Sequence, residues 1–153
     1  MTAHSYALQA RARKMQQAQA IGIDESLISR LVERFYDAVR HDDLLGPVFN
    51  SHIDDWASHL ARMKDFWASM TLESGRYHGN PMLKHIAIGT LGPTHFDRWL
   101  EIWNRIVEEV APTEDAAEAF RSSAKRIAAS LLMAIQVQRG EMVSSMNKRG
   151  HST

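Results

Sequence analysis

One histidine near the middle of the chain lies in an unusually apolar stretch. If residues 54–67, DDWASHLARMKDFW, form a helix, offsets of three and four place His59 on one face with six apolar side chains: Trp56, Leu60, Met63, Phe66, Trp67 and Met70. Histidine is only intermediate in its tendency to be buried, so an imidazole on such a face needs a physical reason. A core histidine bonded to a backbone carbonyl is the simpler reason. The other is a pocket for a flat, apolar group that meets a polar group at its centre.

A second histidine, His85, lies on a predicted short helix, PMLKHIAI, in which Pro81 takes the first helical position. A single imidazole on a short apolar element, facing the helix that carries His59, suits axial ligation of a haem iron. The macrocycle supplies four nitrogens, so the protein needs one strong ligand. The second ring nitrogen of such a ligand is expected to bond a carbonyl one turn earlier. The alternative is a packed or capping histidine near a helix end.

Other metal and nucleophile chemistry finds little support in the sequence. There is no HExxH, HxH or two-histidine-one-carboxylate spacing, which argues against a zinc hydrolase. Gly79 and Pro81 separate His78 from His85, so these two are not expected to share a helix face. The absence of cysteine removes thiolate catalysis and iron–sulfur clusters. Five histidines are expected to be solvated: His4, His41, His52, His95 and His151.

Composition indicates one intracellular globular domain. The 153 residues contain 18 basic and 18 acidic side chains, which argues against a general nucleic-acid or anionic-membrane binder. No apolar run approaches the roughly 20 residues of a membrane-spanning helix. The N-terminus lacks the apolar region of a secretory signal, although it has Arg11, Arg13 and Lys14 and no acidic residue before Asp24. The cytoplasm is the expected location.

Helical start and stop signals divide the chain. Asp24 is expected to cap a helix that ends near His41, before a turn at HDDLLGPVFN. The next helix runs from Asp54 to about Leu72 and is followed by a loop, ESGRYHGN.

After the short helix, Thr94 and Asp97 resemble a capping box for a helix that stops at Ala111-Pro112. Thr113 caps the last helix, and Gly140 is its expected C′ residue. The fold is therefore all-α, with four long helices, one short helix and a long irregular connection. Its expected divisions are a helical or frayed extension at 1–22, a single domain at 23–140 and a disordered tail at 141–153.

Four blocks occur in an order that resembles the truncated haemoglobins of group III: FYDAVRHDDLLGPVFN, DDWASHLARMKDFW, GRYHGNPMLKH and HFDRWLEIW. The resemblance runs from about Leu27 to Val137. It implies an abbreviated globin, a two-over-two helical sandwich with a short proximal helix, that binds haem as iron protoporphyrin IX. The glycine-glycine motifs of the other branches are absent, in agreement with group III.

The resemblance also assigns roles to residues. His85 would be the proximal ligand of the iron. Tyr36 would be the distal tyrosine, whose phenol donates a hydrogen bond to a ligand of the iron. His59 would be the distal-face histidine.

Four further residues would contact the haem. Met63 would fill the pocket beside His59, and Phe49 would wedge against the haem. Trp99 would face the distal pocket as a second donor, and Trp67 would add another contact.

These residues imply reversible binding of oxygen, or of nitric oxide, with stabilisation by the Tyr36 and Trp99 donors. The same donors could polarise an O–O bond in nitric oxide detoxification or peroxidase-like chemistry. The first reaction would need an external reductase, because no flavin or nicotinamide fingerprint is present. The sequence leaves open whether the protein is an enzyme. Two alternatives stay open as well: a haem-based gas sensor that signals through a partner, and a cofactor-free helical interaction module.

Overall fold

The structure is a computed structural model that describes residues 3–72 and 91–140, apart from the side chain of His4. These two ranges contain helices and no strand, so the all-α prediction is confirmed. The helices are α1 (Ala3–Ala20), α2 (Glu25–Arg40), α3 (Leu45–His52), α4 (Trp56–Leu72), α6 (Pro93–Val110) and α7 (Glu114–Gln138). The predicted loop at 73–80, the short helix at 81–88 and the tail at 141–153 lie outside the described residues.

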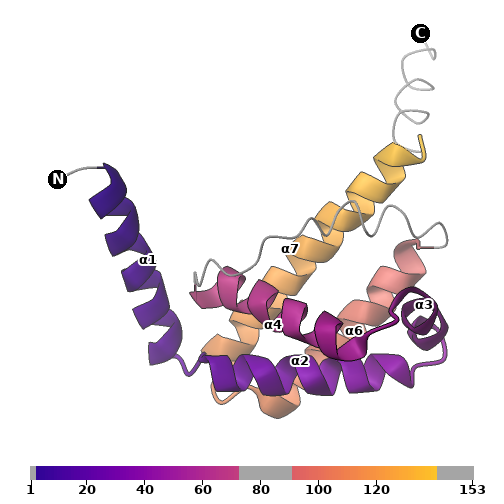
Figure 1. Cartoon of the computed structure of the whole chain (residues 1–153), viewed down its shortest axis with the longest axis horizontal. Coiled ribbons are helices and arrows are strands. Elements are labelled where there is room, and N and C mark those ends of the chain that lie inside the picture. Colours follow the sequence, from indigo (N-terminus) through magenta and orange to yellow (C-terminus); the bar gives the residue numbers. More distant parts are fainter. Residues whose placement is uncertain (1–2, 73–90, 141–153) are drawn as a thin grey trace, which may run out of the picture.

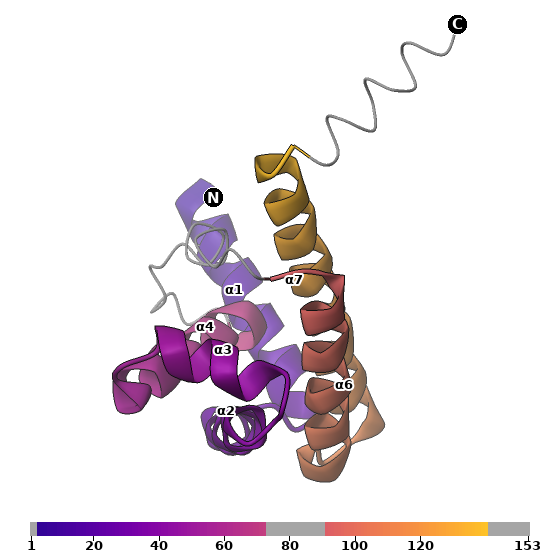
Figure 2. The same ribbon diagram turned by 90° about the vertical axis from the view of Figure 1, so that its right-hand side faces the viewer.

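Two pairs of helices form the body of the molecule. Helix α2 packs against α4, helix α6 packs against α7, and α2 also contacts α6 across the two layers. This is the predicted two-over-two helical sandwich (Figure 1). Helix α1 and the C-terminal end of α7 both project beyond the body on the same side, as two views at right angles show (Figure 2).

Helix α2 forms where the sequence predicts it. The Asp24 carboxylate accepts a hydrogen bond of 2.8 Å from the Leu27 N–H and caps the helix. Its apolar residues recur at helical spacing and are buried against α4 and α6: Leu27, Ile28, Leu31, Val32, Phe35, Tyr36 and Val39.

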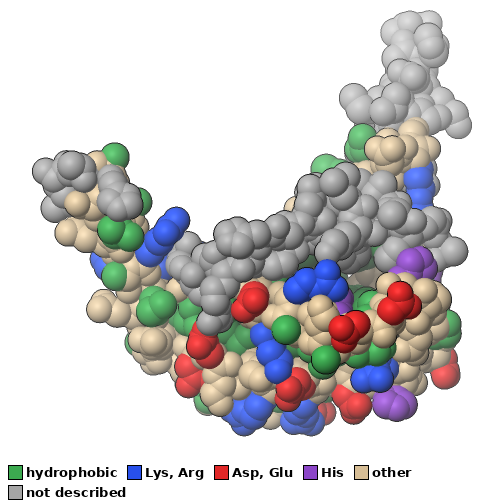
Figure 3. Space-filling view, viewed as in Figure 1, with side chains coloured by type: hydrophobic (Ala, Val, Ile, Leu, Met, Phe, Trp, Pro, Cys, Tyr) green, Lys and Arg blue, Asp and Glu red, His purple; other side chains and the backbone are tan. Residues whose placement is uncertain are grey.

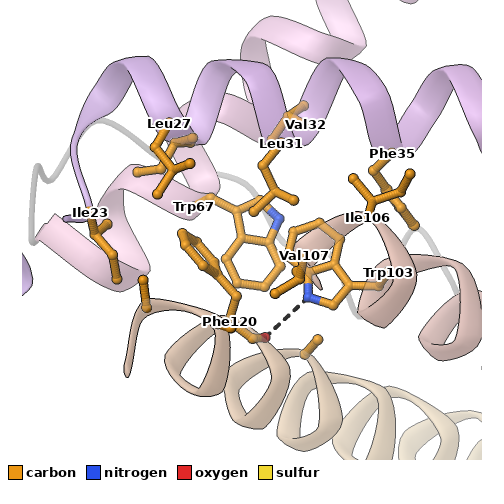
Figure 4. Packing of buried hydrophobic residues seen from close by; sticks show 14 of the residues in the cluster. Ile23, Leu27, Leu31, Val32, Phe35, Trp67, Trp103, Ile106, Val107 and Phe120 are labelled. Carbon is orange, nitrogen blue, oxygen red and sulfur yellow. Dashed lines mark hydrogen bonds between the residues drawn. The ribbon is translucent and has the colours of Figure 1, made fainter. Parts of the chain in front are cut away.

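Two stacked indoles occupy the centre of the core. The ring centroids of Trp67 on α4 and Trp103 on α6 are 4.5 Å apart, with their planes inclined by 15°. Trp103 has 0% of its surface exposed, and its Nε1–H donates a bond of 3.1 Å to the Phe120 carbonyl on α7. Because a buried indole N–H needs an acceptor, this bond fixes the position of α7 against the two rings (Figure 4).

The sequence prediction is wrong at HDDLLGPVFN, which forms helix α3 from Leu45 to His52 instead of a turn. Pro47 lies in the first turn, where an N–H has no acceptor within the helix, so proline is tolerated there. The Asp42 carboxylate accepts bonds from the N–H groups of Leu44 and Leu45, at 3.1 and 2.9 Å. These bonds stabilise the start of α3, where the glycine-proline pair in the sequence indicates a turn instead.

The predicted start of helix α6 is also wrong by two residues. Gly92 is the N-cap of α6 and Pro93 follows at the first helical position, so Thr94 is not the cap. The Gly92 N–H donates to Nδ1 of His95 over 3.3 Å. His95 is therefore a half-buried capping residue rather than the solvated histidine expected from the sequence.

Both ends of α7 agree with the sequence prediction. The Thr113 hydroxyl accepts a bond of 3.0 Å from the Ala116 N–H at the start of the helix. At its other end Gly140 follows the C-cap residue Arg139 and has a φ of 80°, the left-handed conformation that glycine adopts without a Cβ penalty.

Asp42 also joins α3 to α6. Its side chain is 5% exposed, and its Oδ1 accepts from Nε and Nη2 of Arg98, both at 2.8 Å. Burial by itself disfavours the charged carboxylate, but the two N–H donors and the guanidinium outweigh it and hold the pKa of Asp42 below its usual value. The charged form of Asp42 therefore stabilises the fold.

Replacing Asp42 with asparagine is expected to lower the free energy of unfolding at neutral pH by about 1 kcal/mol, because the amide oxygen can still accept from the N–H groups at the start of α3 but the charge that pairs with Arg98 is lost. Because the pKa is depressed in the folded state, the stabilisation is complete above the unfolded pKa and is lost as pH falls through the folded pKa. The difference between wild type and Asp42→Asn should thus shrink below about pH 4. Urea unfolding at several pH values measures this difference in stability, and Asp43→Asn, at the exposed neighbouring residue, is the control. Equal stabilities of wild type and Asp42→Asn at neutral pH would contradict this role.

Candidate functional site

Tyr36 lies at the centre of a group of rings from three helices. It is 6% exposed on α2, and its ring meets the His59 imidazole of α4 edge-to-face, with centroids 4.9 Å apart and planes at 89°. Phe49 of α3 and Trp56 of α4 each lie 6.0 Å from it, centroid to centroid. The phenol ring is thus held among aromatic neighbours from three helices, and its side chain carries a hydroxyl that can donate a hydrogen bond.

His59 occupies the first half of α4, close to the start of the helix. The Asp55 carboxylate accepts a bond of 3.1 Å from the Ser58 N–H and holds this first turn. The ring of His59 lies 5.8 Å from that of Trp56, nearly perpendicular to it, and its Nε2 atom is buried. The Arg40 guanidinium covers Trp56 at 4.5 Å from the ring centroid. The imidazole is therefore half buried, with its Nε2 atom out of contact with solvent.

The apolar face of α4 continues beyond His59 and is only half buried. Its members pack against the core and keep part of their surface exposed: Trp56, Leu60, Met63, Phe66 and Met70. An ion pair of 2.7 Å between Lys64 and Glu33 fixes α4 against α2 beside them. Of these residues, Trp56 contacts the Tyr36 ring, as Phe49 of α3 does, and the others extend the aromatic and thioether face along α4.

Trp99 is separated from Tyr36 by one ring. The Phe35 centroid lies 4.9 Å from that of Tyr36 and 5.6 Å from that of Trp99, edge-to-face in both cases. Trp99 also stacks on Trp103, with centroids 5.9 Å apart and planes at 3°. It is half buried and borders both apolar clusters of the described chain.

The structure does not gather all the predicted site residues. Trp67 is 3% exposed and packs in the core between Trp103 and Phe120, away from the rings around Tyr36. Its predicted contact with a cofactor stays a prediction. His85, the predicted iron ligand, lies outside the described residues, as does His78. In the described ranges no group of three or more histidine, aspartate or glutamate side chains is placed to hold a metal ion.

Two of the other histidines have local backbone roles. Nδ1 of His41 lies 2.7 Å from the Asp37 carbonyl, and Nδ1 of His52 lies 2.9 Å from the Val48 carbonyl. Both side chains are exposed, as the sequence predicts.

Trp56 and Arg40 were not predicted as site residues. The helical stripe places Trp56 on the same face as His59, which is a usable signal. The contacts of Trp56 with Tyr36 and with the Arg40 guanidinium depend on how α2 and α4 cross, and the sequence does not show that crossing.

The described side chains fit a haem in their chemistry. A porphyrin needs an apolar surround, and the half-buried faces of α3 and α4 offer aromatic rings and thioethers. A polarised diatomic ligand is stabilised by hydrogen-bond donors near it, and the ring centroids of a phenol and an imidazole, Tyr36 and His59, lie 4.9 Å apart beside that surround. The haem-based interpretation of the His59 stripe is consistent with this arrangement.

The two-over-two sandwich and the enclosed tyrosine–histidine pair define a protein of the globin class. A family model described as "Bacterial-like globin" matches residues 18–133, so the chain belongs to the bacterial-like globins. Globins bind diatomic gases at haem, and membership of the family implies haem and gas binding for this chain.

Two relatives place the chain within the family. It is 38% identical over 91 residues to the "Group 3 truncated hemoglobin ctb" of Campylobacter jejuni, a match that covers 57% of this chain and 68% of the relative. The crystal structure of a group III truncated haemoglobin from Campylobacter jejuni matches with a TM-score of 0.70 and 32% identity, covering 74% of this chain and 91% of that one. The predicted membership of group III is therefore confirmed. Among the described helices, none has the length and apolar character to cross a membrane.

Proposed function

We propose that this protein binds oxygen, and also nitric oxide, reversibly at an iron protoporphyrin IX held by His85. The family supports the haem, and the residues around Tyr36 support the finer assignment. When bound, haem supplies an iron that takes up diatomic gases and exchanges electrons. The protein supplies the axial imidazole, the apolar walls and the hydrogen-bond donors.

The observation that carries the proposal is the enclosure of Tyr36. Its hydroxyl belongs to a side chain that is 6% exposed and packs on His59, Phe49 and Trp56. A donor in such an apolar surround bonds a polarised ligand more strongly than a donor in water does. Tyr36 therefore stabilises a bound gas, while Phe49 and Met63 keep water from it. His59 is placed to donate to the ligand or to orient the phenol, and Trp99 is the third donor.

These donors also support an activity. Hydrogen bonds to a bound ligand polarise an O–O bond, which favours conversion of nitric oxide and oxygen to nitrate, or peroxidase-like turnover. Conversion of one nitric oxide and one oxygen to nitrate consumes one electron, so an external reductase is the partner that this activity requires.

Steady-state consumption of nitric oxide tests the activity. The haem-loaded protein with oxygen and a chemical reductant is expected to consume nitric oxide continuously and to release an equal amount of nitrate. One burst of consumption, without further turnover while reductant is present, would contradict an enzymatic role.

The surface of α1 favours a gas sensor as the second candidate. The helix is exposed from Tyr6 to Gln17 and carries Arg11, Arg13 and Lys14 without an acidic residue. Hydrophobic and basic side chains are visible along this arm (Figure 3). Such a surface suits a partner protein that distinguishes the gas-bound globin from the gas-free one. A single burst of nitric oxide consumption would favour this candidate.

A further inference from the structure

Helix α3 depends on its neighbours for its position. It is 8 residues long, and its buried residues are Leu45 and Gly46, both in the first turn. The rest of the helix is half buried or exposed. A helix of this length is marginal in water by itself, so the contacts at its start decide where it lies. These contacts are with α2 and α6, and α3 lies against both (Figure 2).

Arg98 of α6 anchors the start of α3. Its Nε and Nη2 atoms each lie 2.8 Å from Oδ1 of Asp42, whose side chain is 5% exposed. The other oxygen of this carboxylate, Oδ2, accepts from the N–H groups of Leu44 and Leu45. One carboxylate therefore joins the guanidinium of α6 to the first turn of α3. Because the bonds from Arg98 are charge-assisted, they belong to the stronger class of hydrogen bonds.

The end of α2 touches α3 at a glycine. A Cβ on Gly46 would lie 2.8 Å from the Arg40 carbonyl oxygen, which is closer than Cβ atoms approach other atoms in proteins. Nδ2 of Asn50, one turn later, donates to the same carbonyl over 3.4 Å. Any side chain at position 46 would therefore force α3 and the end of α2 apart.

Phe49 connects the position of α3 to Tyr36. Its ring meets the Tyr36 ring edge-to-face, with centroids 6.0 Å apart and planes at 63°. The other rings against Tyr36 come from α2 itself, at Phe35, and from α4, at Trp56 and His59. The phenol oxygen lies on the axis of the ring, so the position of the ring decides where the hydroxyl lies. A shift of α3 removes the support on one side of the Tyr36 ring.

We propose that Arg98 is a positioning residue for the Tyr36 hydroxyl. Arg98 acts through Asp42 on α3, and α3 acts through Phe49 on the Tyr36 ring. When α3 shifts, the hydroxyl meets a bound gas at a longer distance and a poorer angle, and a hydrogen bond weakens with both. This inference rests on the proposed function, because it concerns the donor that gas binding uses.

Amide hydrogen exchange in the haem-loaded, full-length protein tests the first step, from Arg98 to α3. Arg98→Gln removes the charge and should speed exchange of the α3 amides about tenfold, because local opening no longer breaks the bonds between Arg98 and Asp42. Arg105→Gln is the matched control, since it removes an equal charge from an exposed position of α6 and should leave exchange in α3 unchanged. Exchange in α3 that is the same in Arg98→Gln as in the wild type would overturn the proposal, whatever the protein does with gas.

Oxygen release and the C–O stretching frequency of bound carbon monoxide test the second step, from α3 to Tyr36. Arg98→Gln should speed oxygen release about threefold, less than Tyr36→Phe does, because the hydroxyl is displaced rather than removed. The C–O frequency responds to a donor near the ligand, so it should move part of the way toward its value in Tyr36→Phe. In the Tyr36→Phe protein, Arg98→Gln should change neither quantity, since no hydroxyl is left to position. An equal acceleration of release with and without the hydroxyl would show that Arg98 acts on the pocket in general, and would overturn the proposal.

Gly46→Ala gives an independent test from the α2 side, which holds if Arg98→Gln does not fold. The added Cβ displaces α3 from the Arg40 carbonyl, so oxygen release should again become faster only when the Tyr36 hydroxyl is present. Unfolding midpoints show which variants keep the fold. If Tyr36→Phe changes oxygen release and the folded variants of Arg98 and Gly46 do not, the positioning role is wrong and the proposed function stands. If Tyr36→Phe itself changes nothing, Tyr36 is not the donor, and the positioning role is wrong with it.

Discussion

Replacing Tyr36 with phenylalanine is expected to speed the release of oxygen from the haem-loaded protein at least tenfold. The change removes the hydroxyl and keeps the ring, so the edge-to-face contacts with His59 and Phe49 persist. A hydrogen bond to a charged or strongly polarised acceptor contributes roughly 1.5–3 kcal/mol, which corresponds to about one to two decades in the release rate. Stopped-flow displacement of oxygen by carbon monoxide measures the rate.

Two controls separate a lost hydrogen bond from a change in packing. Tyr6→Phe makes the same chemical change on α1, where the residue is 63% exposed, and should leave oxygen release unaltered. Carbon monoxide is a weaker hydrogen-bond acceptor, so Tyr36→Phe should change its release far less than that of oxygen. An oxygen release rate equal to that of the wild type would exclude Tyr36 as a donor to the ligand.

Replacing His85 with alanine is expected to abolish or severely weaken the Soret band of the haem-loaded protein. The imidazole is proposed as the single protein ligand of the iron, so its removal leaves the haem with apolar contacts alone. Those contacts hold a macrocycle weakly and do not fix the iron, and haem should then pass readily to an acceptor protein. Visible spectra, together with the rate of haem transfer to an apoglobin acceptor, measure both effects.

The controls for His85 test ligation directly. His52→Ala removes an exposed histidine of α3 and should leave the spectrum unchanged. His85→Gly leaves space for a free imidazole, so added imidazole should restore the Soret band if the fold is intact. A His85→Ala protein with the spectrum of the wild type would show that another residue ligates the iron.

The long helices could be predicted because their signals are local. Asp24 and Thr113 accept bonds from N–H groups three residues later, and the apolar residues of α2 recur every three or four positions. Helix α3 was missed because its start depends on Asp42, which is fixed by Arg98, a residue 56 positions away. Glycine followed by proline is a turn signal in the sequence, and a tertiary contact overrides it here.

The residues of the candidate site could be proposed from the sequence, but their geometry could not. Tyr36, Phe49 and His59 follow from the resemblance, and the structure brings their rings together. The sequence could not show that Trp56 contacts Tyr36, because that contact depends on the crossing of α2 and α4. Nor could the sequence show that Trp67 faces the core. The apolar face of α4 is wide, so the spacing of Trp67 is compatible both with the core and with the side that carries His59.

The junction between the end of α1 and the start of α7 was not predictable for the same reason. Ile21 and Thr113 lie far apart in the chain, and the sequence predicts the N-terminal stretch only as helical or frayed. The bond from Thr113 to Ile21 brings the two helices together. Contacts of this kind carry no local sequence signal.

A haem titration of the purified wild-type protein, followed by visible spectroscopy, tests the central claim most directly. A Soret band that saturates at one haem per chain is the predicted result. A protein that shows no more absorbance than free haem at every ratio would contradict haem binding, and would leave His59 and the apolar face of α4 as parts of a cofactor-free helical core.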